Sequence, residues 1–333
     1  MSPHIKVPFN PELDVVLESL PEEPPLLKEG LQERRNEMGA MMKRERSVIH
    51  PSIVHEKRAT TGPNGEVKLA ILRLKNGAEG PRPAIYYIHG GGMVFGSRFF
   101  GIDTTFEWIK QLDVVVISVE YRLAPEFPDP APIEDCYAGL KWLGEHTAEL
   151  GINPEKIMVA GHSAGGGLAA GTALLVRDRG GPKLCAQCLI YPMLDDRMIT
   201  TSSQQYMDEG TWTGKNNIVA WDWLLAGKRG AKDVSIYAAP ARALDLSGLP
   251  PTWIDVGGAE LFRDENVAYA TKLWEAGVQT ELHVWEGGWH AFDIYAPASK
   301  LAKVCLETRF SWIRRVFAGT ETLPAPKKVP AVL

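Results

Sequence analysis

The sequence predicts an α/β protein, in which helices cover both faces of a mostly parallel sheet. Short apolar runs of strand length alternate with longer segments of helical periodicity from residue 84 to residue 316. Residues 114–119 are rich in β-branched side chains, as expected of a strand that is covered on both faces. The chain has 333 residues, of which 45% are hydrophobic and 23% charged. This composition fits one large globular domain, or one domain that carries an insertion.

The first strands surround a turn signal. Residues 52–75 are predicted to form two antiparallel strands joined at Asn64-Gly65, a pair that suits a tight turn. Strands are then expected at residues 84–88, 114–119 and 157–160, and a helix at residues 133–145.

The alternation continues to the end of the chain. Helices are expected at residues 168–178, 265–276 and 301–316, and strands at residues 186–191, 252–256 and 281–285. Repeated strand–helix units predict parallel neighbours.

Two segments interrupt this rhythm and are predicted to form a helical cap. Residues 1–48 contain an amphipathic helix with apolar side chains from Leu26 to Met42, and residues 197–235 are a polar insertion that holds several tryptophans. The core then consists of residues 49–196 and 236–322, and a proline-containing tail follows at residues 323–333.

Composition argues against several functional classes. A net charge of -5 gives no electrostatic reason to expect nucleic acid, and no segment is apolar enough to span a membrane. The N-terminus lacks the apolar core of a signal peptide, and the four cysteines include one C-x-x-C, Cys185 and Cys188, without a second pair or a His cluster. We therefore expect a cytoplasmic protein with buried free thiols and with no metal or cofactor. The sequence does not distinguish a monomer from a homodimer.

The segment Gly161-His162-Ser163-Ala164-Gly165 has the form G-x-S-x-G and lies between a predicted strand and a predicted helix. This context is typical of the nucleophile elbow of an α/β-hydrolase, where the serine occupies a strained turn. Gly161 and Gly165 satisfy the need for small residues on either side. Ser163 is therefore the candidate nucleophile.

A serine hydroxyl needs a base, and in this fold the base follows the serine along the chain. Of the eight histidines, only His283 and His290 follow Ser163. His283 lies inside a predicted strand, whereas His290 lies in the glycine-containing loop beyond it, at the carboxyl edge where active sites gather. His290 is the predicted base.

Three carboxylates compete for the role of the acid that orients the base. Glu260 lies in the loop directly after the strand at residues 252–256, Asp264 is predicted to be a helix N-cap, and Asp195 follows the preceding strand. We favour Glu260, but the sequence leaves Asp264 and Asp195 open.

The run His89-Gly90-Gly91-Gly92 follows another strand and leaves backbone N–H groups free to approach an oxyanion. It matches the H-G-G-G motif, which acts with the N–H of the residue after the nucleophile, here Ala164.

These motifs resemble the hormone-sensitive-lipase-like (family IV) group of serine carboxylesterases, from about residue 53 to residue 317. Further matching segments are Tyr121-Arg122-Leu123-Ala124-Pro125-Glu126, Tyr191-Pro192-Met193-Leu194-Asp195 and Phe262-Arg263-Asp264-Glu265. The resemblance implies an eight-stranded sheet, a cap made from the N-terminus and an insertion, and hydrolysis of small-molecule carboxylic esters through an acyl-enzyme. It also implies that Gly91, Gly92 and Ala164 supply the oxyanion N–H groups.

The chain departs from the family pattern at two positions. Glu260 stands where the family usually has an aspartate, and the triad accepts either acid. His162 stands before the serine where this group usually has an aspartate. We expect its place on the elbow to turn it away from the hydroxyl.

Other readings of the same fold are a lactonase or lyase and a non-catalytic small-molecule receptor. The receptors that resemble this family lack the catalytic histidine, so His290 favours an enzyme. Aromatic residues near the serine, Phe95, Trp212 and Trp223, are expected to line a closed pocket for short or compact acyl groups.

Overall fold

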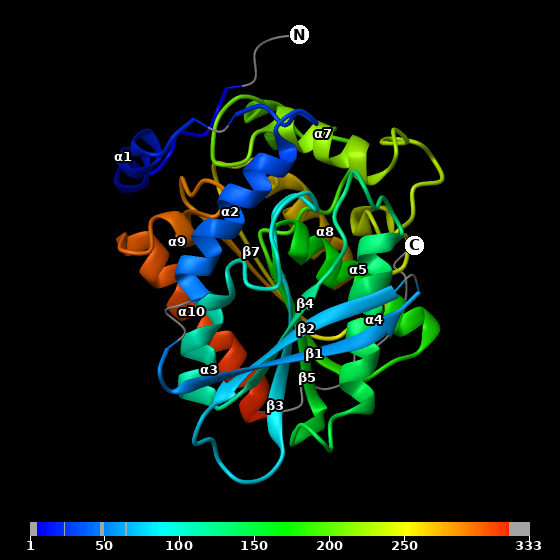
Figure 1. The fold of residues 1–333 in the computed structure, drawn as a ribbon. Coiled ribbons are helices and arrows are strands. Elements are labelled where there is room, and N and C mark those ends of the chain that lie inside the picture. The colour runs from blue at the N-terminus through cyan, green and yellow to red at the C-terminus, as the bar shows by residue number, and fades with distance from the viewer. Residues whose placement is uncertain (1–4, 23, 47–49, 64, 320–333) are drawn as a thin grey trace, which may run out of the picture.

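The computed structural model describes residues 5–22, 24–46, 50–63 and 65–319. Its strands are β1 (Ile53–Gly62), β2 (Gly65–Leu74), β3 (Arg82–Ile88), β4 (Val115–Glu120), β5 (Ile152–His162), β6 (Leu184–Ile190), β7 (Thr252–Gly257) and β8 (Thr280–Trp285). They form one eight-stranded sheet in the order β1-β2-β4-β3-β5-β6-β7-β8 (Figure 1). β2 pairs antiparallel with β1 and with β4, and every other pair of neighbours is parallel. The predicted sheet is confirmed.

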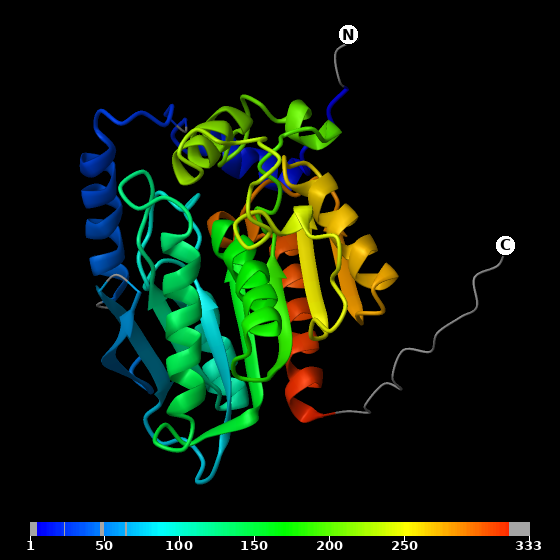
Figure 2. The ribbon, with the colours of Figure 1, turned by 90° about the vertical axis from the view of Figure 1, so that its right-hand side faces the viewer.

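Helices cover both faces of this sheet, as predicted. The described helices are α1 (Pro11–Ser19), α2 (Leu31–Arg46), α3 (Phe106–Leu112), α4 (Ala131–Glu145), α5 (Ala164–Arg179), α6 (Thr201–Gln205), α7 (Gly214–Leu224), α8 (Arg263–Glu275), α9 (Phe292–Tyr295) and α10 (Lys300–Ala318). α4, α5 and α8 lie on one face, and α3 and α10 lie on the other (Figures 1 and 2). Long stretches of the central strands are fully buried between these layers, among them Val115 to Val119 of β4.

The N-terminal segment differs from the prediction. The amphipathic helix begins at Leu31 instead of near Leu26. Gly30 has a positive φ of 75°, which a right-handed helix does not allow, so the helix cannot extend back through this residue. Leu26 is still buried, and its N–H donates to Asn216 Oδ1 at 2.8 Å. The helix α1 was not predicted, although Asn10 caps it and Pro11 occupies its first turn.

The two segments assigned to the cap lie over the carboxyl ends of the parallel strands (Figure 2). α6 and α7 belong to the predicted insertion, and the N-terminal segment contacts it: Tyr206 Oη donates to Val7 O at 2.8 Å, and Asn216 Nδ2 donates to Pro24 O at 3.1 Å. The division of the chain into core and cap is still a prediction. The predicted tail at residues 323–333 lies outside the described residues.

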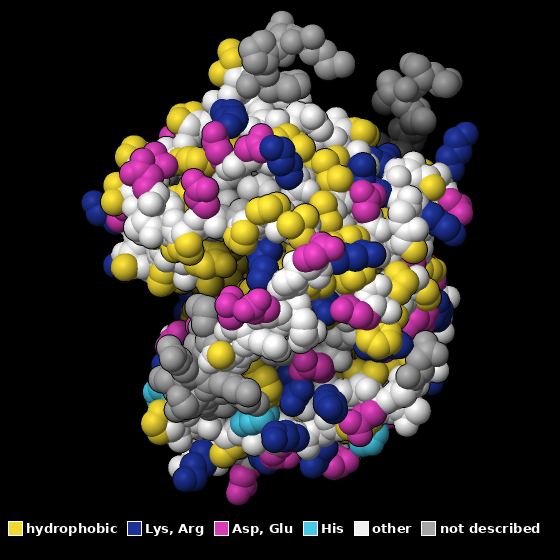
Figure 3. Space-filling view, turned by 45° about the horizontal axis from the view of Figure 1, so that its top comes forward, with side chains coloured by type: hydrophobic (Ala, Val, Ile, Leu, Met, Phe, Trp, Pro, Cys, Tyr) yellow, Lys and Arg dark blue, Asp and Glu magenta, His cyan; other side chains and the backbone are white. Residues whose placement is uncertain are grey.

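On the face that these segments form, charges of both signs are interspersed with apolar side chains (Figure 3). Such a mixed face favours neither an anionic nor a cationic partner. Among the described helices, none combines the length and the apolar character that a membrane span requires.

Candidate active site

Ser163 occupies the turn between β5 and α5 with φ 56° and ψ -125°, a backbone conformation that residues other than glycine rarely adopt. The turn can be this tight because both flanking glycines lack a side chain. A Cβ at Gly161 would collide with the backbone of Gly165, and a Cβ at Gly165 would collide with the carbonyl oxygen of Ile88. The strand–turn–helix setting predicted for the serine is therefore present, and the serine is presented at the N-terminus of α5.

Three predicted residues from three different strand ends meet here. His290 Nε2 lies 2.9 Å from Ser163 Oγ, and His290 Nδ1 lies 2.5 Å from Glu260 Oε2. The other carboxylate oxygen, Glu260 Oε1, accepts a hydrogen bond of 2.9 Å from the N–H of Gly257 at the end of β7. All three side chains are buried, so little water competes for these contacts.

This chain of contacts fixes the tautomer of the imidazole. A carboxylate can only accept hydrogen bonds, so the Nδ1 of His290 carries a proton and donates a hydrogen bond to Glu260. Nε2 then keeps its lone pair and accepts from the Ser163 hydroxyl. The arrangement can remove a proton from Ser163 and leave an imidazolium beside a buried carboxylate.

Other residues hold His290 that the sequence did not single out. Thr211 Oγ1 donates to His290 O at 2.5 Å, and the rings of Tyr191 and Phe262 meet the imidazole edge to face at 5.0 and 5.1 Å. Thr211 belongs to the insertion, far from His290 in the sequence, so no local pattern pointed to this contact. Tyr191 and Phe262 lie within segments that carry the family resemblance, which was their only signal.

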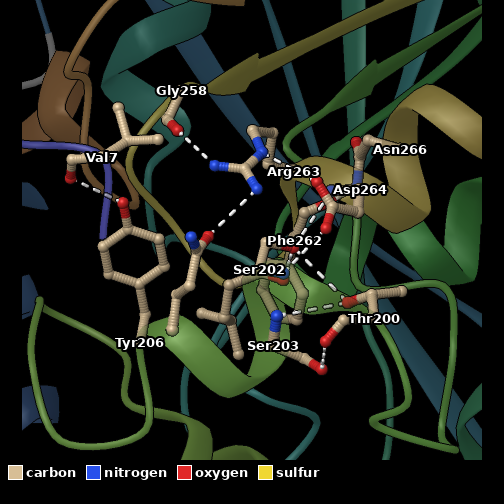
Figure 4. A network of polar contacts seen from close by, with 12 residues as sticks. Val7, Thr200, Ser202, Ser203, Tyr206, Gly258, Phe262, Arg263, Asp264 and Asn266 are labelled. Carbon is tan, nitrogen blue, oxygen red and sulfur yellow. Dashed lines mark hydrogen bonds and ion pairs between the residues drawn. The ribbon is translucent and has the colours of Figure 1, made fainter. Parts of the chain in front are cut away.

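The two competing carboxylates have other partners. Asp264 accepts from Ser202 N at 2.7 Å and pairs with Arg263 Nε at 2.7 Å (Figure 4). Asp195 pairs with Arg197, with Nε–Oδ1 and Nη2–Oδ2 distances of 2.8 and 2.6 Å. In the described part of the chain, neither carboxylate hydrogen-bonds to His290.

The interpretation of Asp264 as a helix N-cap is wrong. α8 begins one residue earlier, at Arg263, and the residue in the capping position, Phe262, has no polar side chain to cap it. The carboxylate of Asp264 instead reaches the first turn of α6, where an unpaired N–H attracts an anion. Asp264 thereby ties α6 to α8.

Two other histidines, His283 and His162, contact residues other than Ser163. His283 lies in β8, stacked on Trp253 at 4.6 Å. His162 directs its ring nitrogens to Tyr87 and Gly90, away from Ser163, as expected. Burial lowers the pKa of His162 to about 3, so its ring is neutral at neutral pH.

The glycine loop after β3 has a backbone conformation that favours glycine. Gly91 and Gly92 have φ values of 104° and 62°, and a Cβ at Gly91 would collide with the carbonyl group of Phe95. Ala164 begins α5. Among the described residues, no protein group accepts from the amides of Gly91, Gly92 or Ala164. These are the N–H groups that were predicted to bind an oxyanion.

Of the three aromatic residues predicted to line the pocket, Trp212 lies against the glycine loop, Phe95 is buried beside α2, and Trp223 packs against the core. The ring of Trp212 packs against Gly92, where a Cβ would collide with it, and Trp212 Nε1 donates to Asn217 Oδ1 at 3.0 Å. Phe95 is buried, with Arg34 of α2 4.9 Å above its ring. Trp223 is half-buried in α7 and packs against the core.

The described residues contain no group of three or more His, Cys, Asp or Glu side chains suited to hold a metal ion. The four cysteines are free; Cys136, Cys188 and Cys305 are buried and Cys185 is half-buried.

Known proteins are similar to this chain over most of its length. A family model described as "alpha/beta hydrolase fold" matches residues 85–294. Esterase LipI of Mycobacterium tuberculosis is 35% identical over 255 residues, which cover 75% of this chain and 78% of that protein. Carboxylesterase NlhH of the same organism is 40% identical over 217 residues, which cover 60% of this chain and 63% of that protein. The solved structure of a bacterial heroin esterase has a TM-score of 0.87 and 37% identity, and covers 93% of this chain and 98% of that one.

Proposed function

The chain belongs to the α/β-hydrolase fold family, in its hormone-sensitive-lipase-like group of ester-hydrolysing enzymes, and on this basis we propose that it is a serine carboxylesterase acting through an acyl-enzyme. The observation that carries the mechanism is the hydrogen-bonded chain from Ser163 through His290 to Glu260. A buried serine hydroxyl that hydrogen-bonds a correctly oriented base is the arrangement that acyl transfer requires.

In the first half of the reaction, Ser163 Oγ attacks the carbonyl carbon of the ester while its proton passes to His290 Nε2. The carbonyl oxygen becomes an oxyanion, which accepts hydrogen bonds from Gly91, Gly92 and Ala164. The ester C–O bond then breaks, and His290 gives its proton to the departing alcohol. Glu260 stabilises the imidazolium that exists between these two transfers.

In the second half, water replaces the alcohol. His290 removes a proton from the water, whose oxygen attacks the acyl carbon and forms a second oxyanion in the same site. The bond to Ser163 Oγ breaks as His290 returns the proton to it, and the carboxylic acid leaves.

We further propose that the substrates are short-chain or compact esters. The contact of the Trp212 ring with Gly92 supports this, because Gly92 belongs to the loop proposed to bind the oxyanion. Ser163 is only 7% exposed, which also favours a small pocket over an open groove.

The test is kcat/KM for p-nitrophenyl esters from acetyl to palmitoyl. Each methylene that fits should raise kcat/KM about fourfold, from about 0.8 kcal/mol of burial, until the chain meets the aromatic wall. Trp212→Ala and Trp223→Ala should move the optimum to longer chains, and the matched control Trp274→Ala, on the exposed side of α8, should not. A wild-type optimum at long chains would contradict the compact pocket and point to a lipase.

We also propose a reducing, cytoplasmic setting, which the four free thiols support.

A further inference from the structure

The ring of His162 fills a narrow space between two loops at the end of β5. A Cβ at Gly90 would lie 2.7 Å from its Nε2, and a Cβ at Gly101 would lie 2.8 Å from its Cε1. His162 is buried, and the rings of Tyr87 and Phe100 lie 5.8 and 5.5 Å away. The residue that precedes Ser163 therefore touches both the glycine loop after β3 and the loop that precedes α3.

The hydrogen bonds of His162 require one tautomer. The N–H of Gly90 donates to His162 Nε2 at 3.2 Å, so this nitrogen carries no proton. Tyr87 Oη donates to Gly101 O at 3.0 Å and lies 2.8 Å from His162 Nδ1. Since the hydroxyl has only one proton, it accepts from Nδ1–H. A carboxylate at this position would supply no donor for Tyr87.

Gly90 is also held at its other end. Its carbonyl oxygen lies 2.8 Å from His89 Nδ1, and the hydroxyl of Tyr121, which lies 2.9 Å from His89 O, is 3.3 Å from it. A peptide group is planar, so a fixed Gly90 carbonyl also fixes the direction of the Gly91 N–H in the same peptide. The contact with His162 fixes the preceding peptide through the Gly90 N–H. Two consecutive peptides thus lead into Gly91 with defined orientations.

We propose that His162 is a positioning residue that aims the oxyanion-binding amides of Gly91 and Gly92 by holding the N–H of Gly90. This proposal rests on the esterase function proposed above. His162 does not touch the reacting atoms; it acts through Gly90. Loss of His162 should therefore reduce the stabilisation of the transition state and leave the affinity for the substrate nearly unchanged.

Two matched substitutions separate the two ring nitrogens. In His162→Gln the side-chain oxygen can occupy the place of Nε2 and accept from Gly90. In His162→Asn the amide ends near the place of Nδ1, so it can donate to Tyr87 but leaves Gly90 without an acceptor. Comparison of the two variants isolates the contact with Gly90, because both replace the ring by an amide.

The measurements are kcat and KM for p-nitrophenyl butyrate and the Ki of an alkyl trifluoromethyl ketone, to which Ser163 adds to give a tetrahedral oxyanion. His162→Asn should lower kcat about 10- to 100-fold, below the loss expected for removal of a whole oxyanion donor. KM should change less than about threefold, and the Ki should rise in parallel with the fall in kcat. His162→Gln should recover most of both losses.

Three results would overturn the proposal: wild-type kcat and Ki in His162→Asn, equal losses in the Asn and Gln variants, or a loss that resides in KM. If His162→Asn does not fold, Tyr87→Phe replaces it, because it frees the Nδ1 proton to move to Nε2 and so disrupts the same contact. It should lower kcat and raise the Ki together, and unchanged values would equally overturn the proposal. A wild-type protein without Ser163-dependent hydrolysis would instead contradict the proposed function.

Discussion

Glu260→Gln tests the proposed acid with almost no change in side-chain size. In the wild type, one carboxylate oxygen accepts from Gly257 N at 2.9 Å and the other lies 2.5 Å from His290 Nδ1. A glutamine has one oxygen and one NH2 group. If the oxygen stays with Gly257, the NH2 group faces Nδ1; if the amide turns, the NH2 group faces the Gly257 N–H. Either way a donor meets a donor, and only the clash at Nδ1 can be relieved, by the imidazole moving its proton to Nε2.

The size of the loss follows from that proton. An imidazole protonated at Nε2 cannot accept the hydroxyl proton of Ser163, and an amide cannot stabilise the imidazolium by its charge. The loss of a triad acid can cost on the order of 10⁴-fold in kcat, which is about 5.4 kcal/mol in the barrier. Asp264→Asn, which weakens a partly exposed contact between α6 and α8, should cost less than about tenfold.

The assay is kcat for p-nitrophenyl acetate in Glu260→Gln, Asp264→Asn and Asp195→Asn, with thermal melting of each variant to verify its fold. The reasoning is refuted if Asp264→Asn or Asp195→Asn lowers kcat more than Glu260→Gln does.

Two further predictions concern the fold. Leu13 is fully buried in one cluster with Trp289, the residue before His290. Leu13→Ala should therefore weaken the packing of α1 on the core by about 2 to 5 kcal/mol and speed hydrogen exchange at residues 10–20. Val15→Ala, at an exposed position, should change neither, and equal exchange in the two variants would contradict this role. Burial, and secondarily Glu134, raises the pKa of Asp129 from 3.8 to about 6, so its ionised form destabilises the folded state, with no penalty below pH 3.8 and the full penalty above pH 6. Asp129→Asn should therefore stabilise the protein by about 1 kcal/mol at pH 8 and leave it nearly unchanged at pH 4, as measured by urea unfolding; an equal gain at both pH values would refute the role of ionisation.

The sheet could be predicted from the sequence because its strands are apolar runs that both layers of helices bury. The prediction was weakest where part of an element is polar or where an element is too short to show a periodic apolar pattern. β5 begins at Ile152 instead of residue 157, since Asn153 to Lys156 lie at the partly exposed end of the sheet. α3 is short, and its apolar residues Phe106, Trp108, Ile109 and Leu112 span only about two turns of helical pattern.

The parts of the candidate site that follow strand ends could also be predicted, because the strand order brings those ends to one edge of the sheet. The contacts of Thr211 and Asp264 could not, since they join segments far apart in the chain. The same holds for His162, whose departure from the family pattern was visible but whose partners, Tyr87 and Gly90, depend on how β3 and β5 align.

The most direct test of the account is the covalent labelling of Ser163 by an organophosphate, followed by intact-mass and peptide mass spectrometry together with residual esterase activity. The wild-type protein should gain one adduct, on the peptide that contains Ser163, and lose activity in proportion to labelling. Ser163→Ala should gain no adduct and show no turnover, with an unchanged circular dichroism spectrum. Ester hydrolysis at the wild-type rate in Ser163→Ala, or an inactivating adduct on another residue, would contradict the proposed mechanism.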